Sequence, residues 1–196
     1  MSKADQKERT HAAILASASR LVRERGIGAA RVADVMRGAG LTVGGFYAHF
    51  ASKESLVDEV FRSAAAAARA RFFAGIDDKP ANAKVEVLLK RYLSPAHRDA
   101  AAEGCPMPAV ISEVSTTAPE HRAAFAEGVD GLAHEIESRL PEGTSAPRMI
   151  ALGVVALMLG GITLARATQG TPLSDEILKA CRSFGRNVFS GRVGNG

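Results

Sequence analysis

Residues 39–56 read Ala-Gly-Leu-Thr-Val-Gly-Gly-Phe-Tyr-Ala-His-Phe-Ala-Ser-Lys-Glu-Ser-Leu, and this stretch decides the fold. A short helix with apolar residues at Val32, Val35 and Met36 is expected just before it, and a second short helix is expected to begin near Thr42. Two short helices joined by a glycine-containing turn of three or four residues are typical of a helix-turn-helix motif. Gly40 fits the turn, because glycine adopts positive φ without strain.

The second of these helices is unusual because it contains two adjacent glycines. Each glycine in a helix interior costs about 1 kcal/mol relative to alanine. Gly44 and Gly45 also remove side chains from one face, which lets that face approach another molecule closely. Phe46 and Phe50, four residues apart, are predicted to face the core, together with Leu41 from the turn.

Polar groups are predicted on the outer side of the same segment. Tyr47 and His49 are expected to point their polar tips outward, and Lys53 lies in the first turn of the next helix. Free N–H groups and the helix dipole favour a phosphate at that position. Each residue also has an ordinary interpretation: Tyr47 as a packing residue, His49 as a surface residue and Lys53 as a solvated cap.

Charge is divided unevenly along the 196 residues, whose formal net charge is +4. Residues 1–53 carry nine Lys and Arg against four acids, whereas the other 143 residues carry 16 basic and 17 acidic groups. A basic end on a near-neutral body is typical of a protein whose basic end meets a polyanion. A basic solvated tail would give the same count.

The rest of the chain also has the pattern of helices. Apolar spacing from Ile14 to Val22 predicts a first helix that ends at Gly26, and Ser52 is expected to cap a long fourth helix that ends near Gly75. Further helices are expected at about 81–94, 107–117, 119–140, 146–168 and 173–190. We therefore predict an all-α protein, with a three-helix head over residues 1–52 and a helical body over residues 53–196.

Residues 39–56 closely resemble the DNA-binding signature of the TetR family of bacterial transcriptional regulators, and the resemblance extends over about residues 10–60. It implies a homodimer that binds a palindromic DNA operator, and a body that dimerises through its last two helices and holds a small-molecule effector. Carried over by position, the resemblance gives phosphate contacts at Thr42, Tyr47, His49 and Lys53 and base contacts at Val43, Gly44 and Gly45. Ala30 and Arg31 replace the hydroxyl residues usual there, and Arg31 is expected to bind a phosphate instead.

The expected dimer interface lies in the last two helices. Residues 149–165 carry no charge, which is marginal against the ~20 residues of a membrane span, so we expect a buried helix rather than a membrane helix. Its small-residue face consists of Gly153, Ala156, Gly160, Thr163 and Ala167, beside an apolar face of Leu152, Val155, Leu159 and Ile162. The last helix offers a stripe of Ile177, Cys181, Phe184 and Val188, with Cys181 as a core residue. Two such pairs of helices would form an intersubunit four-helix bundle.

An effector pocket is predicted from uncharged residues of the body. The candidates are Phe72, Leu88, Leu89, Tyr92, Cys105, Met107, Val110, Ile111, Val114 and Phe125. They favour a hydrophobic or aromatic ligand, although an ordinary core has the same pattern. Cys105 precedes a predicted helix, whose dipole can lower a thiol pKa, so it is either a sensor of electrophiles and oxidants or a buried structural thiol.

Enzyme motifs are missing from the sequence. There is no Walker loop and no nucleophile elbow, and Gly38-Ala39-Gly40 lacks the third glycine of a dinucleotide fingerprint. The five histidines have no metal-ligand spacing, and two distant cysteines form no disulfide framework. We expect a cytoplasmic protein without catalytic activity, cofactor or metal. The competing hypothesis is a helical protein-binding module that does not recognise DNA sequence.

Overall fold

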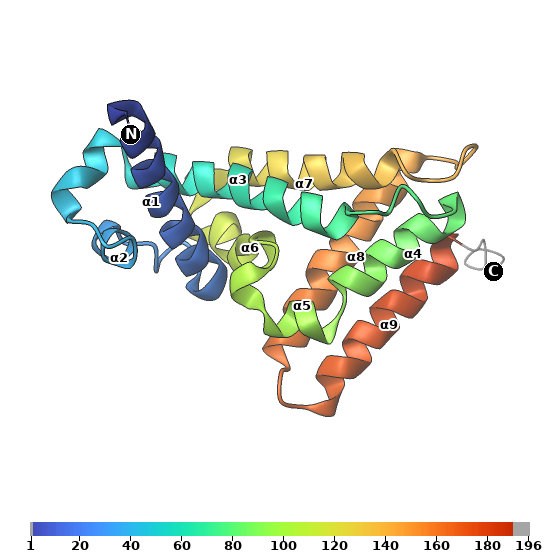
Figure 1. Cartoon of the computed structure of the whole chain (residues 1–196). Helices are drawn as coiled ribbons and strands as arrows, with labels where there is room; N and C mark the ends of the chain where they lie inside the picture. The colour runs from blue at the N-terminus through green and yellow to red at the C-terminus, as the bar shows by residue number, and fades with distance from the viewer. Residues whose placement is uncertain (1, 190–196) are drawn as a thin grey trace. The chain divides into compact units, whose positions relative to one another are not determined.

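The structure is a computed structural model that describes residues 2–189. Within that range no residue is in a strand, which confirms the predicted all-α class (Figure 1). The elements are α1 (Lys3–Arg25), α2 (Val32–Gly38), η1 (Val43–Ala48), α3 (Lys53–Phe73), α4 (Ala81–Tyr92), α5 (Pro95–Asp99), η2 (Ala101–Glu103), α6 (Met107–Thr116), η3 (Pro119–His121), α7 (Arg122–Glu137), α8 (Pro147–Ala167) and α9 (Pro172–Phe189).

The apolar pattern of the first helix starts at Ile14, but helix α1 begins at Lys3, eleven residues earlier. Its first turn is held by a capping box, in which the Asp5 N–H donates to Ser2 Oγ (3.1 Å) and the Ser2 N–H donates to Asp5 Oδ2 (2.9 Å). These bonds lower the pKa of Asp5, with the Ser2 N–H as the largest cause. The early part of α1 therefore depends on capping and not on burial. Apolar periodicity alone does not detect a helix start of this kind.

Compact packing divides the chain into two units, the first of which consists of residues 1–66 and 102–128. Its core contains Ile14, Val35, Phe46 and Leu56, each less than 1% exposed. Helix α6 packs on α1 in this unit, and the Glu113 carboxylate accepts hydrogen bonds from two N–H groups of the α1–α2 loop. The same core therefore holds α1, α2, η1 and the start of α3 together.

The close approach of α1 and α2 depends on Gly38. An added Cβ at this position would collide with the Ser17 hydroxyl, which donates to the Val35 carbonyl oxygen at 2.9 Å. In the turn that follows α2, Gly40 has a φ of +72°, as predicted, and Leu41 packs against the core. The packing of the two helices and the turn between α2 and η1 thus each depend on a glycine.

The second unit consists of residues 67–101 and 129–196, of which the structure describes those up to 189. Helix α8 packs along α9, and α4 packs against both (Figure 1). The Ser174 hydroxyl donates to the Ala165 carbonyl oxygen at 2.7 Å and fixes the start of α9 against the end of α8. Arg166 donates to the His97 carbonyl oxygen at 2.9 Å and ties α8 to α5.

Several predicted boundaries differ from the observed ones. The segment after α4 is not a simple break, because Ser94 caps a short helix by accepting from the His97 N–H at 3.1 Å. The expected helix over 119–140 is divided into η3 and α7, and the segment after Thr42 is a 3₁₀ helix and not an α-helix. Two adjacent glycines in six residues disfavour a regular α-helix there.

Helix α8 is buried on one side only in the single chain, and its predicted cover by a second subunit stays a prediction. Met149 is 70% exposed, Leu164 is 56% exposed and Leu152 is 41% exposed. By length and composition alone α8 could cross a membrane, but its other side packs on α9 and α4 as a core helix does. The helix therefore has one buried face and one exposed apolar face.

Candidate nucleic-acid interface

Element η1 is anchored by two phenylalanines. Phe46 is fully buried and Phe50 is 4% exposed, and their rings stack with centroids 5.7 Å apart. This confirms the predicted core-facing pair. Tyr47 is 71% exposed and Val43 is 49% exposed, so the opposite side of η1 is open.

The two glycines of η1 lie on that open side. A Cβ added at Gly44 would have no heavy atom within 4 Å, and one added at Gly45 would lie 3.7 Å from Met36 Cε. Packing among the described residues therefore requires neither glycine. An exposed element without side chains at these positions allows another molecule to approach the backbone closely.

Lys53 is the first residue of α3. A reciprocal pair of hydrogen bonds precedes it, in which the Ser55 N–H donates to Ser52 Oγ and the Ser52 N–H donates to Ser55 Oγ, both at 3.1 Å. The prediction that Ser52 caps this helix is thus confirmed. Because α3 has 21 residues, its amino end carries the positive end of a long helix dipole.

His49 differs from its prediction. Its Nδ1 atom is buried and has no hydrogen-bond partner among residues 2–189, so this part of the ring does not point outward. The ring lies 6.1 Å from that of His11, which stacks on Phe50 with a centroid distance of 4.4 Å. Burial lowers the pKa of His49, and the nearby His11 and Lys7 lower it further. A neutral His49 can act as a hydrogen-bonding group but adds no positive charge.

Arg31 is exposed and is the residue that precedes α2, and its side chain makes no capping hydrogen bond. Thr42 holds the same position before η1 and likewise makes no side-chain capping bond. Both side chains are therefore available to a ligand. Sequence reasoning missed three arginines that the fold brings around Arg31, namely Arg20, Arg25 and Arg37. Their signal was the basic charge of the first 53 residues, but only the packing of α1 on α2 gathers them.

Comparison with known proteins identifies this segment. Residues 14–60 match the bacterial regulatory proteins of the tetR family. The segment that carries η1 is therefore similar to this family. Over 49 residues it is 47% identical to the HTH-type transcriptional repressor KstR2 of Mycobacterium tuberculosis, and likewise to KstR2 of Rhodococcus jostii. That match spans 25% of this chain and 24% of each repressor.

Solved structures extend the likeness to the whole fold. A TetR transcriptional regulator from Chloroflexus aurantiacus superimposes with a TM-score of 0.77 at 24% identity, over 95% of this chain and 96% of that one. The reduced form of Escherichia coli NemR gives a TM-score of 0.77 at 21% identity, over 91% and 95% of the two chains. At these identities the likeness concerns the fold alone, so the body of this chain has the same architecture as these two proteins.

The residues predicted to line an effector pocket fall into both units. In the second unit Phe72, Leu88, Leu89 and Tyr92 are all buried. The ring of Phe72 lies 4.9 Å from that of Tyr92, and both rings contact His97 with centroid distances of 4.8 and 4.5 Å. Sequence reasoning did not find His97, whose buried ring completes this aromatic cluster.

In the first unit the remaining pocket candidates lie on or beside α6 and on α7. Cys105, Met107, Val110 and Val114 are buried, Phe125 is half-buried and Ile111 is 39% exposed. Val110 and Val114 belong to the same hydrophobic core as Phe46 of η1. The packing of α6 is therefore continuous with the packing that supports η1.

The predicted dimer face lies on the open side of α8. Gly153, Ala156 and Gly160 are exposed, and a Cβ added at either glycine would meet nothing within 4 Å. Thr163 is half-buried and Ala167 is exposed. The expected apolar face is mostly internal, because Val155, Leu159 and Ile162 are buried.

On α9 the predicted stripe divides between two faces. Phe184 is 55% exposed, whereas Cys181 is half-buried and lies where a Cβ on Gly161 would approach its Sγ to 2.9 Å. Cys181 is thus a residue of the intramolecular α8–α9 contact, and burial raises its pKa. Ile177 is half-buried, and the side chain of Val188 lies outside the described residues.

Proposed function

We propose that this protein is a cytoplasmic transcriptional repressor that binds double-stranded DNA through η1. One observation carries the proposal: the segment that matches the TetR family presents an exposed, glycine-bearing element on a base of buried phenylalanines. Repression is taken from the names of the KstR2 relatives, which match this same segment. The DNA-binding part is assigned to residues 1–52 and the regulatory part to residues 53–196.

We assign two kinds of DNA contact to two sets of residues. Val43, Gly44 and Gly45 would face base edges in the major groove, because they lie on the open side of η1. Backbone phosphates would be bound by Arg31, Thr42, Tyr47, His49 and Lys53. Base contacts would specify the sequence, and phosphate contacts would fix the position of the protein on it.

Selection from a pool of random duplex DNA, followed by mobility shifts over a salt series, tests this function. We expect an imperfect palindrome of roughly 15 to 20 base pairs, with affinity that falls steeply as salt rises. Lys53→Ala should weaken binding to every sequence and reduce the salt slope by about 1. Lys79→Ala also removes one positive charge, but from an exposed site of the second unit, and should change neither the DNA affinity nor its salt slope. Recovery of no preferred sequence would contradict the proposal.

A homodimer through α8 and α9 is the second part of the proposal. The apolar residues on the open side of α8, and Phe184 of α9, are exposed to solvent in the single chain. A two-fold symmetric pairing of this area would place two copies of η1 on half-sites about one helical turn apart. Sedimentation at micromolar concentration should give a dimer, and a wild-type monomer would contradict both the pairing and the palindrome.

A small hydrophobic or reactive molecule is the proposed effector. It would release DNA only if it binds the DNA-competent and DNA-incompetent states with different affinity. Helix α3 begins in the first unit and ends in the second, so it is the candidate lever between effector and DNA. The candidate lining consists, in the second unit, of the uncharged residues on α3 and α4 named above and, in the first unit, of those on or beside α6 and on α7.

The role of Cys105 is tested by titrating the operator complex with quinones and, separately, with hydrophobic drugs. Cys105 is 3% exposed, which favours a non-covalent hydrophobic ligand over direct attack on the thiol. We expect release by a hydrophobic compound from wild type and from Cys105→Ser alike. Release by quinones that Cys105→Ser abolishes would instead identify a thiol sensor.

A further inference from the structure

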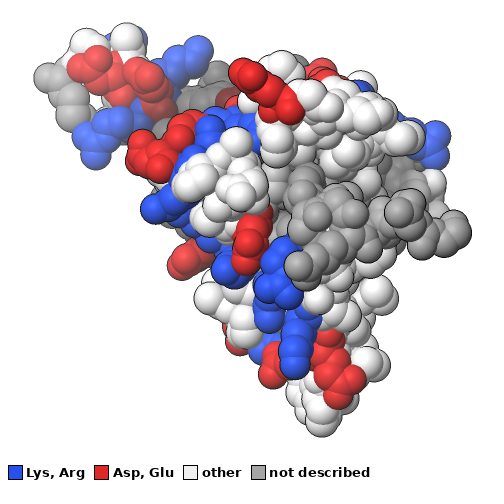
Figure 2. All heavy atoms as spheres, turned by 90° about the vertical axis from the view of Figure 1, so that its right-hand side faces the viewer, with Lys and Arg blue, Asp and Glu red and all other residues white. Residues whose placement is uncertain are grey.

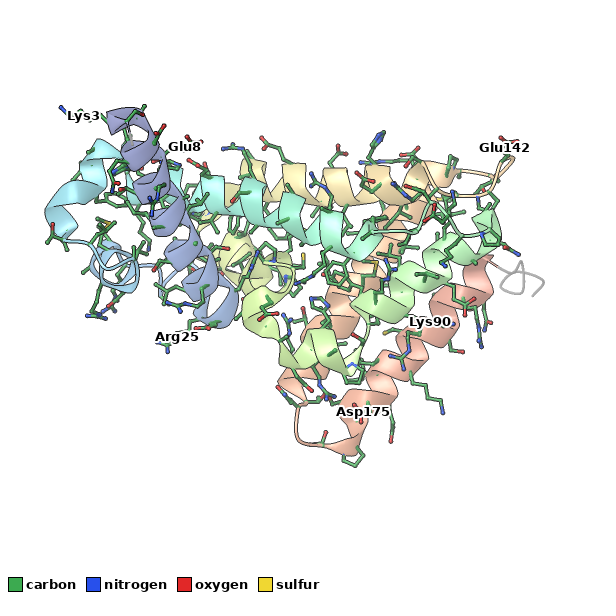
Figure 3. All side chains as sticks on the ribbon, viewed as in Figure 1. Lys3, Glu8, Arg25, Lys90, Glu142 and Asp175 are labelled. Atoms are coloured by element: carbon green, nitrogen blue, oxygen red, sulfur yellow. The ribbon has the colours of Figure 1, made fainter. Side chains whose placement is uncertain are left out.

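A hollow of about 530 Å³ lies in the first unit between the second half of α1 and α2. Four arginines line it: Arg20 and Arg25 from α1, Arg31 from the residue before α2, and Arg37 from α2. All four side chains belong to exposed residues, and Figure 3 marks Arg25 at the carboxyl end of α1. The hollow is thus a strongly basic surface feature.

Its positive charge is largely uncompensated. Asp34 is the acidic residue among the lining side chains, and it forms an ion pair with Arg37. Arg20, Arg25 and Arg31 form no ion pair with any residue of the described range 2–189. Three cations that share one hollow repel each other, and a bound anion would relieve that repulsion.

Small residues keep the hollow open. Gly28, Ala29 and Gly38 contribute to its lining, and a Cβ added at Gly38 would lie 3.5 Å from Nη2 of Arg20. The Arg20 guanidinium therefore crosses from α1 to the end of α2, while Arg31 lies at the beginning of α2. Cationic groups thus lie at both ends of one helix, along a single cavity.

A guanidinium group can bind phosphate through two parallel hydrogen bonds, because its planar fork of N–H donors matches two phosphate oxygens better than an ammonium group does. A hollow of this volume is larger than one phosphate group, so it has room for part of a phosphodiester chain. The residues of η1 do not line it, so its contacts would add to those of the base-facing element.

We propose that this arginine hollow binds phosphates of the DNA backbone that flank the sequence contacted by η1. The inference rests on the proposed function, because it assigns a second contact surface for the same DNA. Arg20 and Arg25 would hold the flanking strand, and Arg31 would connect that contact to the phosphates nearer η1. The affinity for DNA would then depend on the length of the duplex beyond the palindrome.

The test compares the selected palindrome as a bare duplex with the same palindrome carrying ten more base pairs at each end. Fluorescence anisotropy over a salt series gives the dissociation constant and its salt slope for both. The double variant Arg20→Ala, Arg25→Ala should bind the extended duplex about tenfold more weakly and reduce its salt slope by about 2. Its affinity for the bare duplex should be nearly that of wild type. Asp34→Asn, which frees Arg37, should shift affinity for the extended duplex in the opposite direction.

Thermal melting of each variant confirms that the fold is retained, and Lys79→Ala again controls for loss of one charge. If the double variant lost the same affinity for both duplexes, or lost affinity for neither, the inference would be overturned while the proposed function stands. Failure of the wild type to bind either duplex would overturn the proposed function and the inference together. Inorganic phosphate, added at constant ionic strength, tests a free anion as the source. If it binds wild type but not the double variant, and the variant binds extended DNA normally, the hollow is a site for a free anion and the inference is wrong.

Discussion

Element η1 and helix α8 share a property that distinguishes them from the rest of the chain. Gly44 and Gly45 in η1, and Gly153 and Gly160 in α8, leave their Cβ positions without close neighbours in the single chain. At Gly38 and Gly161, in contrast, an added Cβ would collide with a neighbouring helix. Because glycine in a helix costs about 1 kcal/mol, internal packing explains the second group but not the first.

The surroundings of the two open faces differ. Beside η1 lie the exposed phenol of Tyr47 and the arginines of α1 and α2, whereas α8 presents Met149, Leu152 and Leu164. A helix face whose glycines have no close neighbour indicates where another molecule can approach. The side chains around that face indicate which kind of molecule it is. A polyanion fits the first face and a second apolar helix pair fits the other.

A third surface, between α4 and α9, shows that charge alone is less informative. Figure 2 looks onto the side where these helices lie, and blue and red side chains alternate there. A hollow of about 240 Å³ in this region is lined by Leu89, Lys90, Lys179, Arg182 and Arg186, among others. Lys90 pairs with Glu86, and Arg182 donates to the Leu93 carbonyl oxygen, so half of these cations are already engaged.

The largest expected effect is a loss of folding stability in acid, caused by the buried His97 in the unit that contains α8. Burial lowers the pKa of His97 to about 4, against 6.5 for an unperturbed histidine. Between these values the unfolded chain binds a proton that the folded chain does not, so stability falls as the pH falls. The loss should reach about 3 kcal/mol at pH 4, at about 1.4 kcal/mol per pH unit. Urea unfolding followed by circular dichroism at pH 7, 6, 5 and 4 measures it.

Two variants assign that loss to His97. His97→Gln should flatten the dependence below pH 6.5, because the buried titrating group is gone. His134→Gln removes an exposed histidine and should leave the dependence unchanged. An unchanged slope in His97→Gln would show that other groups control acid unfolding.

The next effect concerns the open face of η1. Gly44→Leu should reduce affinity for the selected palindrome about a hundredfold, toward the level of non-specific DNA, because the added side chain separates the element from the bases. The melting temperature should change little, since nothing lies within 4 Å of the new Cβ. Mobility shifts with the palindrome and with a scrambled duplex measure the effect. Retained specificity would mean that η1 does not approach the bases.

A smaller effect is expected at the corresponding face of α8. Gly160→Leu should raise the dimer dissociation constant about thirtyfold, because a large side chain would prevent close approach of two helices. Sedimentation equilibrium over a concentration series measures this, with Lys79→Ala as a surface control. A dimer as tight as wild type would place the subunit contact elsewhere.

Much of this arrangement could be predicted from the sequence because it depends on local patterns. Residue type and spacing predict the turn at Gly40, the anchoring pair Phe46 and Phe50 and the cap at Ser52, and the structure confirms them. Most helix boundaries of the body follow from proline and glycine positions and agree to within a few residues.

Features that depend on long-range packing could not be predicted in this way. His97 looks like a surface histidine in the sequence and is buried by Phe72 and Tyr92, which precede it by 25 and 5 positions. Helical spacing places Cys181 on the same stripe as Phe184, but in the structure the Cys181 side chain lies close to Gly161 of α8. The arginine hollow requires α1 and α2 to lie side by side, and charge counts along the chain do not contain that information.

The smallest expected effect tests the distinction between packed and open glycines within one helix. At Gly161 an added Cβ would lie 2.8 Å from Leu93 Cδ2 and 2.9 Å from Cys181 Sγ, whereas at Gly153 it would meet nothing. Alanine gains about 1 kcal/mol of helix propensity at either site, and the crowding at Gly161 costs a further 1–3 kcal/mol. Gly161→Ala should therefore be less stable than Gly153→Ala by about 2 kcal/mol in urea unfolding at pH 7. Because both changes add the same methyl group to α8, the difference isolates packing. Equal stability of the two variants would mean that α8 and α9 can separate slightly without cost, and that the empty Cβ positions do not distinguish a partner face from an internal one.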